Sequence, residues 1–233
     1  MTVYRWAEHL QNLVFPPHCR LCGSPVAAAF RLCMACEQEL PWLAAGCVQC
    51  AHPGAAGALC GRCQQRSPAF DCTTALFHYR PPVDHLLKSL KFSGELAIAP
   101  LLARLLAGRI AARHEPLPGL LVAVPLHRSR LHERGFNQAT LLATRLGRQL
   151  AIPVAQRLCA RRRATYPQSL LGTTARRLNM RRAFAIHGTP PATHVAIVDD
   201  VMTTGHTAGE LARALKLAGA HRVEVWVIAR ARR

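Results

Sequence analysis

Apolar and amphipathic stretches alternate along the chain from residue 83 onward. Helical spacing of apolar positions predicts four helices, at residues 83–92, 96–113, 137–150 and 207–217, the second of which possibly starts after Pro100. Continuous apolar runs predict buried strands at residues 120–124, 195–198 and 223–228, with a further short strand near Val154. Because strands alternate with helices, this part of the chain is expected to form a parallel sheet flanked by helices.

The first part of the chain is distinguished by its cysteines. Eight of the ten cysteines form four CxxC pairs, which are Cys19/Cys22, Cys33/Cys36, Cys47/Cys50 and Cys60/Cys63. A CxxC turn presents two thiolates to a metal at about 2.3 Å, and two such turns complete a tetrahedral site. We therefore expect structural zinc, two ions per chain. An iron–sulfur cluster and a disulfide framework are the alternatives, and the latter needs an oxidising compartment.

Two pairings of the CxxC turns are open. A sequential pairing joins the first turn with the second and the third with the fourth, whereas an interleaved cross-brace joins the first with the third. The sequential pairing is favoured because Cys33–Cys36 opens a helical stretch. The domain expectation is an amino-terminal helix with a four-cysteine zinc-finger module over residues 1–70 and an α/β domain over residues 71–233.

The chain is strongly basic, with a formal net charge of +18. Residues 134–198 contain no Asp or Glu but many Arg, which indicates an anionic partner without identifying it. The first 15 residues resemble an amphipathic helix rather than a secretion signal. The apolar stretch 101–112 is interrupted by Arg104 and Arg109, so we expect a cytoplasmic protein with no membrane insertion.

The stretch VAIVDDVMTTGHTAGELARAL carries the candidate chemistry. A buried strand ends in Asp199 and Asp200, and a loop then leads into a helix. The loop residues are Thr203, Thr204, Gly205, His206 and Thr207. Backbone N–H groups at a helix amino terminus bind anions, a glycine lets the backbone approach closely, and Thr207 is a candidate cap. The two carboxylates suit ribose hydroxyls, directly or through Mg²⁺, and they also suit positive charge that develops on the sugar.

VAIVDDVMTTGHT resembles the signature with which type I phosphoribosyltransferases bind phosphoribosyl pyrophosphate (PRPP). Together with the CxxC pairs, LKSLKFSGE, VPLHRSRLHERGFNQA and RRRATYPQ…RRLNMRRAF, nearly the whole chain resembles the ComF family. The resemblance implies a type I phosphoribosyltransferase-like sheet, PRPP with Mg²⁺ as ligands, and an association with competence and the use of external DNA.

The resemblance also implies roles for further residues. Pyrophosphate is expected at Pro125, Leu126, His127 and Arg134. Asn137 is as readily a helix cap as a ligand-binding residue. The stretch 161–182 corresponds to a mobile loop, which is expected to close over PRPP or to bind nucleic acid through Arg161, Arg162, Arg163 and Gln168. At position 206 this chain has His where members of the family mostly have a small residue. Purine-salvage relatives carry an acidic residue where this chain has Thr203, and this difference weakens any assignment as a purine-salvage enzyme.

Three functional hypotheses follow. The first is Mg²⁺-dependent transfer of phosphoribosyl from PRPP to an unidentified acceptor. The second is a non-catalytic adaptor that binds single-stranded DNA, although aromatic residues make up only 6% of the chain and limit base stacking. The third is a scaffold whose zinc fingers contact a helicase-like component of the DNA-uptake machinery.

Overall fold

A computed structural model describes residues 18–26, 32–55, 57–161 and 183–232. The chain divides into two compact units, Met1–Pro41 and Trp42–Arg233, each of which is described by itself. Because the boundary falls after Pro41, the second group of four cysteines belongs to the same unit as the sheet. The expected amino-terminal helix lies outside the described residues. None of the helices in the described ranges is long and apolar enough to cross a membrane.

The first unit is built around two cysteine turns. Cys19 N donates to the Ser24 carbonyl at 2.7 Å, and Gly23 takes a φ of 74° in this turn. The second turn opens the short helix α2 (Met34–Gln38), which Cys33 caps by accepting from Cys36 N at 3.4 Å. The helical stretch that the sequence predicted after Cys33 is therefore confirmed.

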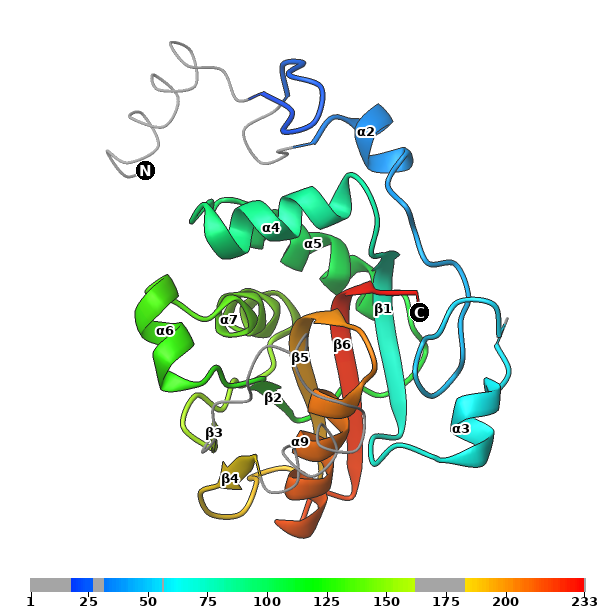
Figure 1. The fold of residues 1–233 in the computed structure, drawn as a ribbon, viewed down its shortest axis with the longest axis vertical. Helices are drawn as coiled ribbons and strands as arrows, with labels where there is room; N and C mark the ends of the chain where they lie inside the picture. Colours follow the sequence, from blue (N-terminus) through cyan, green and yellow to red (C-terminus); the bar gives the residue numbers. More distant parts are fainter. Residues whose placement is uncertain (1–17, 27–31, 56, 162–182, 233) are drawn as a thin grey trace. The chain divides into compact units, whose positions relative to one another are not determined.

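The second unit contains a parallel four-stranded sheet in the order β1-β6-β5-β2 (Figure 1). Its strands are β1 (Cys72–His78), β2 (Leu120–Ala123), β5 (His194–Met202) and β6 (Arg222–Arg230). A separate antiparallel pair joins β3 (Cys159–Arg161) to β4 (Phe184–Ile186). The predicted fold class, a parallel sheet flanked by helices and preceded by a cysteine-rich module, is confirmed.

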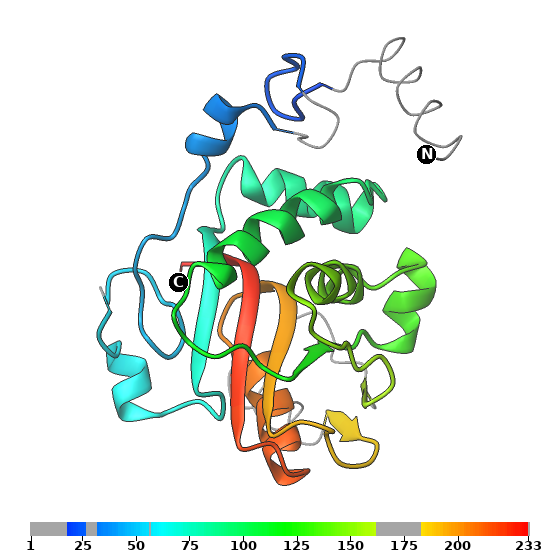
Figure 2. The same cartoon turned by 180° about the vertical axis from the view of Figure 1, so that it is seen from behind.

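Helices cover both faces of this sheet, with α5 and α7 on one face and α9 on the other (Figures 1 and 2). The helices of the unit are α3 (Gly61–Gln65), α4 (Val83–Phe92), α5 (Ile98–Ala111), α6 (Arg128–Arg134), α7 (Gln138–Leu150) and α9 (His206–Leu217). On the α9 face, alternate β6 residues from Val223 to Val227 share one apolar cluster with Leu211 and with Cys47. The second cysteine group is thus part of the core of the α/β unit.

Three details differ from the sequence-based expectations. Helix α5 starts at Ile98, so a start after Pro100 is wrong; proline is tolerated in a first helical turn, where its missing N–H has no acceptor. Strand β1 was not predicted, because CTTALFH mixes polar and apolar residues without a continuous run. The expected strand near Val154 is reduced to a single parallel bridge with Leu121.

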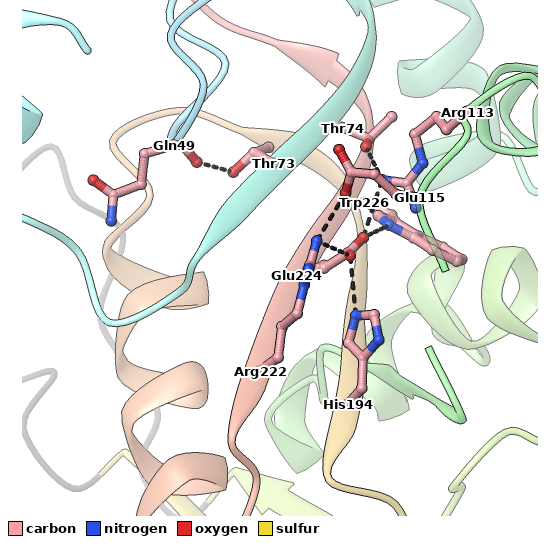
Figure 3. Close-up of polar contacts among 9 residues, drawn as sticks. All are labelled: Gln49, Thr73, Thr74, Arg113, Glu115, His194, Arg222, Glu224 and Trp226. Carbon is pink, nitrogen blue, oxygen red and sulfur yellow. Dashed lines mark hydrogen bonds and ion pairs between the residues drawn. The ribbon is translucent and has the colours of Figure 1, made fainter. Parts of the chain in front are cut away.

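A charged network closes the amino-terminal end of the sheet around Glu224, whose side chain is fully buried (Figure 3). Its carboxylate accepts from Trp226 Nε1 at 2.9 Å and from Arg113 Nη1 at 3.0 Å. It also contacts His194 Nε2 at 3.0 Å and accepts from Arg222 Nη2 at 3.1 Å. Although burial opposes ionisation, these partners lower the pKa of Glu224, so the buried carboxylate is compensated.

We expect Glu224→Gln to lower the free energy of unfolding by about 3 kcal/mol, because it leaves the cations around it without their buried partner. Glu115→Gln removes a mostly exposed carboxylate that also pairs with Arg222, and we expect a loss below about 1 kcal/mol. Since the folded-state pKa of Glu224 is lowered, its stabilisation is present above the unfolded-state pKa and is lost as the pH falls. Urea denaturation over a range of pH measures both effects, and equal losses in the two variants would contradict this account.

Candidate functional site

The candidate site lies at the edge of the sheet where its parallel strands end. Strand β5 pairs with β2 on one side and with β6 on the other, so their carboxyl ends meet at the same edge. Asp199 and Asp200 lie near the end of β5, and Val124 N donates to the Val198 carbonyl at 3.0 Å. The segment that follows β2 therefore begins beside the two carboxylates, as expected for ligand sites in open parallel sheets.

Asp200 is buried, with 3% of its surface exposed, and is held by side chains of two helices. It forms an ion pair with Lys91 of α4, and Gln138 Nε2 of α7 donates to its Oδ1 at 3.4 Å. Gln138 in turn accepts from Arg134 Nη1 at 3.3 Å. This chain of contacts fixes Asp200 within the protein, so it is less available to a ligand than its neighbour.

Asp199 is half-buried, and its Oδ1 accepts from Asp200 N at 2.9 Å. Burial, followed by the negative charge of Asp200, raises the pKa of Asp199 well above its usual range. Arg161 belongs to the same electrostatic neighbourhood: burial and then Arg130 lower its pKa, while Asp199 opposes them. Asp199 is therefore a carboxylate whose ionised form a ligand cation or a set of hydroxyl donors would stabilise.

The loop between β5 and α9 has the geometry of an anion-binding turn. Gly205 is the amino-terminal cap of α9 and takes a left-handed φ of 77°, which a residue with a Cβ rarely adopts. Helix α9 starts at His206, so Thr207 lies inside the first turn, and the expectation that it caps the helix is wrong. The first N–H groups of such a helix have no acceptor within it and are available to an anion. Thr203 and His206 are exposed, whereas Thr204 and Gly205 are half-buried.

The segment expected to bind pyrophosphate follows β2. Pro125, Leu126 and His127 are half-buried, and His127 Nδ1 caps α6 by accepting from Ser129 N at 3.3 Å. Asn137 caps α7 by accepting from Ala139 N at 2.9 Å, and its Nδ2 donates to the Val124 carbonyl at 3.0 Å. Asn137 therefore has the capping role, while its second bond ties α7 to the end of β2.

The remaining predicted residues are only partly described. Arg161 ends β3, and its guanidinium lies 5.9 Å from the centre of the Phe184 ring. Arg162, Arg163 and Gln168 lie outside the described residues, as does the rest of the expected mobile loop. The sequence-based interpretation missed the role of Lys91, because Lys88 one turn earlier looks equivalent in sequence. In the structure Lys88 pairs with Asp84 at 3.0 Å, and only Lys91 reaches Asp200.

The eight CxxC cysteines form two separate groups, and in each the four sulfurs lie within 4.8 Å of one another. The groups are Cys19, Cys22, Cys33 and Cys36, then Cys47, Cys50, Cys60 and Cys63, which confirms the sequential pairing. None of these cysteines forms a disulfide. Sulfurs around a tetrahedral zinc lie roughly 3.8 Å apart, and Sγ–Sγ distances of 3.6 Å occur in both groups.

The pKa values of the sulfurs are split within each group. Burial and the neighbouring thiols raise the pKa of Cys36, Cys50 and Cys63. In Cys19 and Cys47 burial also opposes ionisation, but backbone N–H donors lower the pKa of both thiols to about 6. A lowered pKa favours the thiolate, which is the form that binds zinc. All four ligands in each group are cysteines, so these sites have no open coordination position and are suited to a structural role.

The fold and the two cysteine sites define an α/β protein that carries a double zinc ribbon. The double zinc ribbon domain family matches residues 10–64, a range that contains both groups and supports structural zinc. A DNA utilization protein YhgH from Salmonella typhi is 37% identical over 94% of this chain and 99% of its own length. Competence protein F from Haemophilus influenzae is 36% identical over 92% of this chain and 96% of its own length.

The chain belongs to the ComF family of competence and DNA-utilisation proteins. Competence protein ComFC from Bacillus subtilis is a more distant relative, 26% identical over 79% of this chain and 78% of its own length. Among solved structures, a purine phosphoribosyltransferase from Pyrococcus horikoshii is similar over 68% of this chain and 87% of its own. The TM-score of this match is 0.30, and the sequence identity is 17%.

The two aspartates are expected to differ in what they contribute to stability. Asp200→Asn breaks the ion pair with Lys91 and should cost about 1–3 kcal/mol of unfolding free energy. Asp199→Asn keeps an Oδ1 atom that accepts from Asp200 N, so we expect no loss of unfolding free energy at neutral pH. Because the folded-state pKa of Asp199 is raised, its contribution to stability falls as the pH rises, and the amide removes that pH-dependent loss. Denaturation of both variants at neutral pH measures the contrast; a larger loss for Asp199→Asn would contradict these assignments.

Proposed function

We propose that this edge of the sheet binds PRPP, or a closely related sugar phosphate, together with Mg²⁺. The observation that carries the proposal is the continuous path from Asp199 and Asp200 through the Gly205 turn into α9. The 5′-phosphate lies against the backbone N–H groups of the loop 203–207, where the helix amino terminus favours negative charge. The threonine hydroxyls of this loop add further donors.

The two carboxylates take different parts in the proposed complex. Asp199 accepts from the ribose hydroxyls or holds Mg²⁺, which typically uses one or two carboxylates together with substrate phosphates. Asp200 is a positioning residue, because its carboxylate already forms an ion pair with Lys91 and a hydrogen bond with Gln138. Pyrophosphate lies against the segment 125–127, with Arg134 and Arg161 as the nearby cations.

Phosphoribosyl transfer is the reaction that such a complex suits. The bond between C1 of the ribose and pyrophosphate breaks, and C1 forms a new bond to a nucleophilic atom of the acceptor, which loses its proton. The ionised Asp199 stabilises the positive charge that develops on the sugar. The relatives are named for DNA utilisation and competence, and the proposed reaction would serve that process in the cytoplasm. The acceptor is left unassigned.

Calorimetric titration of PRPP with Mg²⁺ into the zinc-loaded protein tests the proposal. We expect binding by the parent chain and a loss of at least about 100-fold in affinity in Asp199→Asn/Asp200→Asn, since charge-assisted bonds are lost. Glu210→Gln is the matched control, because it removes one negative charge from α9 at a carboxylate that pairs with Arg213. The proposal fails if the parent chain binds no PRPP, or if the double variant binds it as tightly as the parent.

One further observation favours a second candidate function, which is binding of single-stranded DNA. The aromatic ring of Phe92, at the end of α4, is 71% exposed. The guanidinium of Arg134 lies 5.0 Å from the centre of this ring. Helix α6 has no buried residue and exposes Arg128 and Arg130. An exposed ring beside arginines suits a stacked base and its phosphates. Contact of the zinc ribbons with a helicase-like component stays a separate hypothesis.

Anisotropy of a labelled oligo(dT) at increasing salt tests this second function. Phe92→Leu should weaken binding by about tenfold without changing the salt dependence, because it removes the stacking surface. Arg128→Gln/Arg130→Gln should lower the slope of log K against log salt by about 1.4, since each lost phosphate contact contributes about 0.7. The double Asn variant of the aspartates should bind DNA as the parent does. Binding that does not respond to salt would rule out the contact with the DNA backbone.

A further inference from the structure

A buried arginine at the end of β6 is bonded to main-chain carbonyls from two separate parts of the fold. Arg230 is 2% exposed, and its Nε donates to the Cys50 carbonyl at 2.8 Å. Its Nη1 donates to the carbonyls of Met202 at 3.2 Å and Ala231 at 2.7 Å, and also to that of Thr203. One guanidinium therefore joins the second cysteine site to the start of the loop 203–207.

A second set of contacts makes the same connection through Phe70. Gln49 lies inside the Cys47–Cys50 turn, and its Nε2 donates to the Phe70 carbonyl at 3.2 Å. Its own carbonyl accepts from Thr73 Oγ1 of β1 at 2.7 Å (Figure 3). The Phe70 ring is 1% exposed and lies beneath the loop, 3.5 Å from the position that a Cβ on Gly205 would take. The loop thus rests on the ring of a residue whose main-chain carbonyl is bonded to the cysteine turn.

The shape of the cysteine turn depends on its four sulfurs. Cys47, Cys50 and Cys63 are buried and belong to the apolar cluster that also contains Met202 and Ala208. A metal that joins all four sulfurs fixes the carbonyl of Cys50 and the side chain of Gln49, because metal binding and folding are coupled in such sites. The first cysteine group lies in the other compact unit and provides a matched comparison.

We propose that metal binding at the second cysteine site (Cys47, Cys50, Cys60 and Cys63) sets the position of the loop 203–207. Arg230 is the positioning residue that connects the two, through its bonds to the carbonyls of Cys50 and Thr203. The anion-binding role of the loop rests on the proposed function, whereas its dependence on the metal does not. The second zinc ribbon is accordingly a part of the candidate site, and loss of its metal weakens anion binding at a distance from the ligand.

Hydrogen exchange of the full chain, read by mass spectrometry over residues 203–207, tests the proposal without relying on PRPP. Cys60→Ser/Cys63→Ser and Cys19→Ser/Cys22→Ser should each reduce zinc from about two ions to about one per chain. We expect loop exchange at least about tenfold faster in the first variant and unchanged in the second, because only the first loosens bonds to the loop. PRPP affinity should fall in the same variant alone.

Arg230→Met, with both zinc sites intact, keeps the proposal testable if a cysteine variant does not fold. It should also speed exchange in residues 203–207 by about tenfold, while residues 223–228 in the centre of β6 keep their protection. Arg230→Lys keeps one charged donor and should give a smaller increase. Uniformly faster exchange across the sheet, or unchanged loop exchange in Arg230→Met, overturns the inference. A parent chain that binds no PRPP, together with the expected exchange pattern, overturns only the proposed function.

Discussion

Parallel pairing of β5 with both β2 and β6 is the constraint on which the rest of the structure depends. Strands that run in one direction bring their carboxyl ends to a single edge, and the helices that connect them start or end there. Asp199 and the Gly205 turn, which belong to one stretch of the chain, meet the segment after β2 for this reason, although that segment lies far from them in the sequence. The opposite edge is occupied by the network around Glu224, in which each carboxylate oxygen of Glu224 has two partners.

The acidic residues at the two edges of the sheet have different roles, one in stability and the other in the candidate site. At the amino-terminal edge, cations and the Trp226 indole bond a fully buried carboxylate and lower its pKa. At the carboxyl-terminal edge, Asp200 is neutralised by Lys91, but burial and the adjacent charge raise the pKa of Asp199. A carboxylate that is left under-compensated beside a helix amino terminus is more typical of a ligand site than of a packing role.

The sequence was sufficient for the features that depend on local pattern. Apolar runs located β5 and β6, and helical spacing located α4 to its exact bounds. The CxxC spacing predicted the eight metal-binding cysteines, and the helical stretch after Cys33 favoured the pairing that is observed. Features that depend on tertiary contact were not accessible. Lys91 and Lys88 look equivalent in sequence, yet of the two only Lys91 reaches Asp200. The residues around Arg230 in the sequence do not indicate that it bonds to the carbonyl of Cys50, 180 residues away. Strand β1 was missed because its polar residues are satisfied by partners from other elements, such as Gln49 and Arg113.

We propose that the edge formed by Asp199 and the loop 203–207 holds a sugar phosphate. A crystal structure of the chain with PRPP and Mg²⁺ tests it most directly. We expect phosphate density against the N–H groups of residues 204–207, with the ribose or the metal ion beside Asp199. Density for PRPP at any other place, with no ligand at this loop and at Asp199, would rule out the proposed binding site.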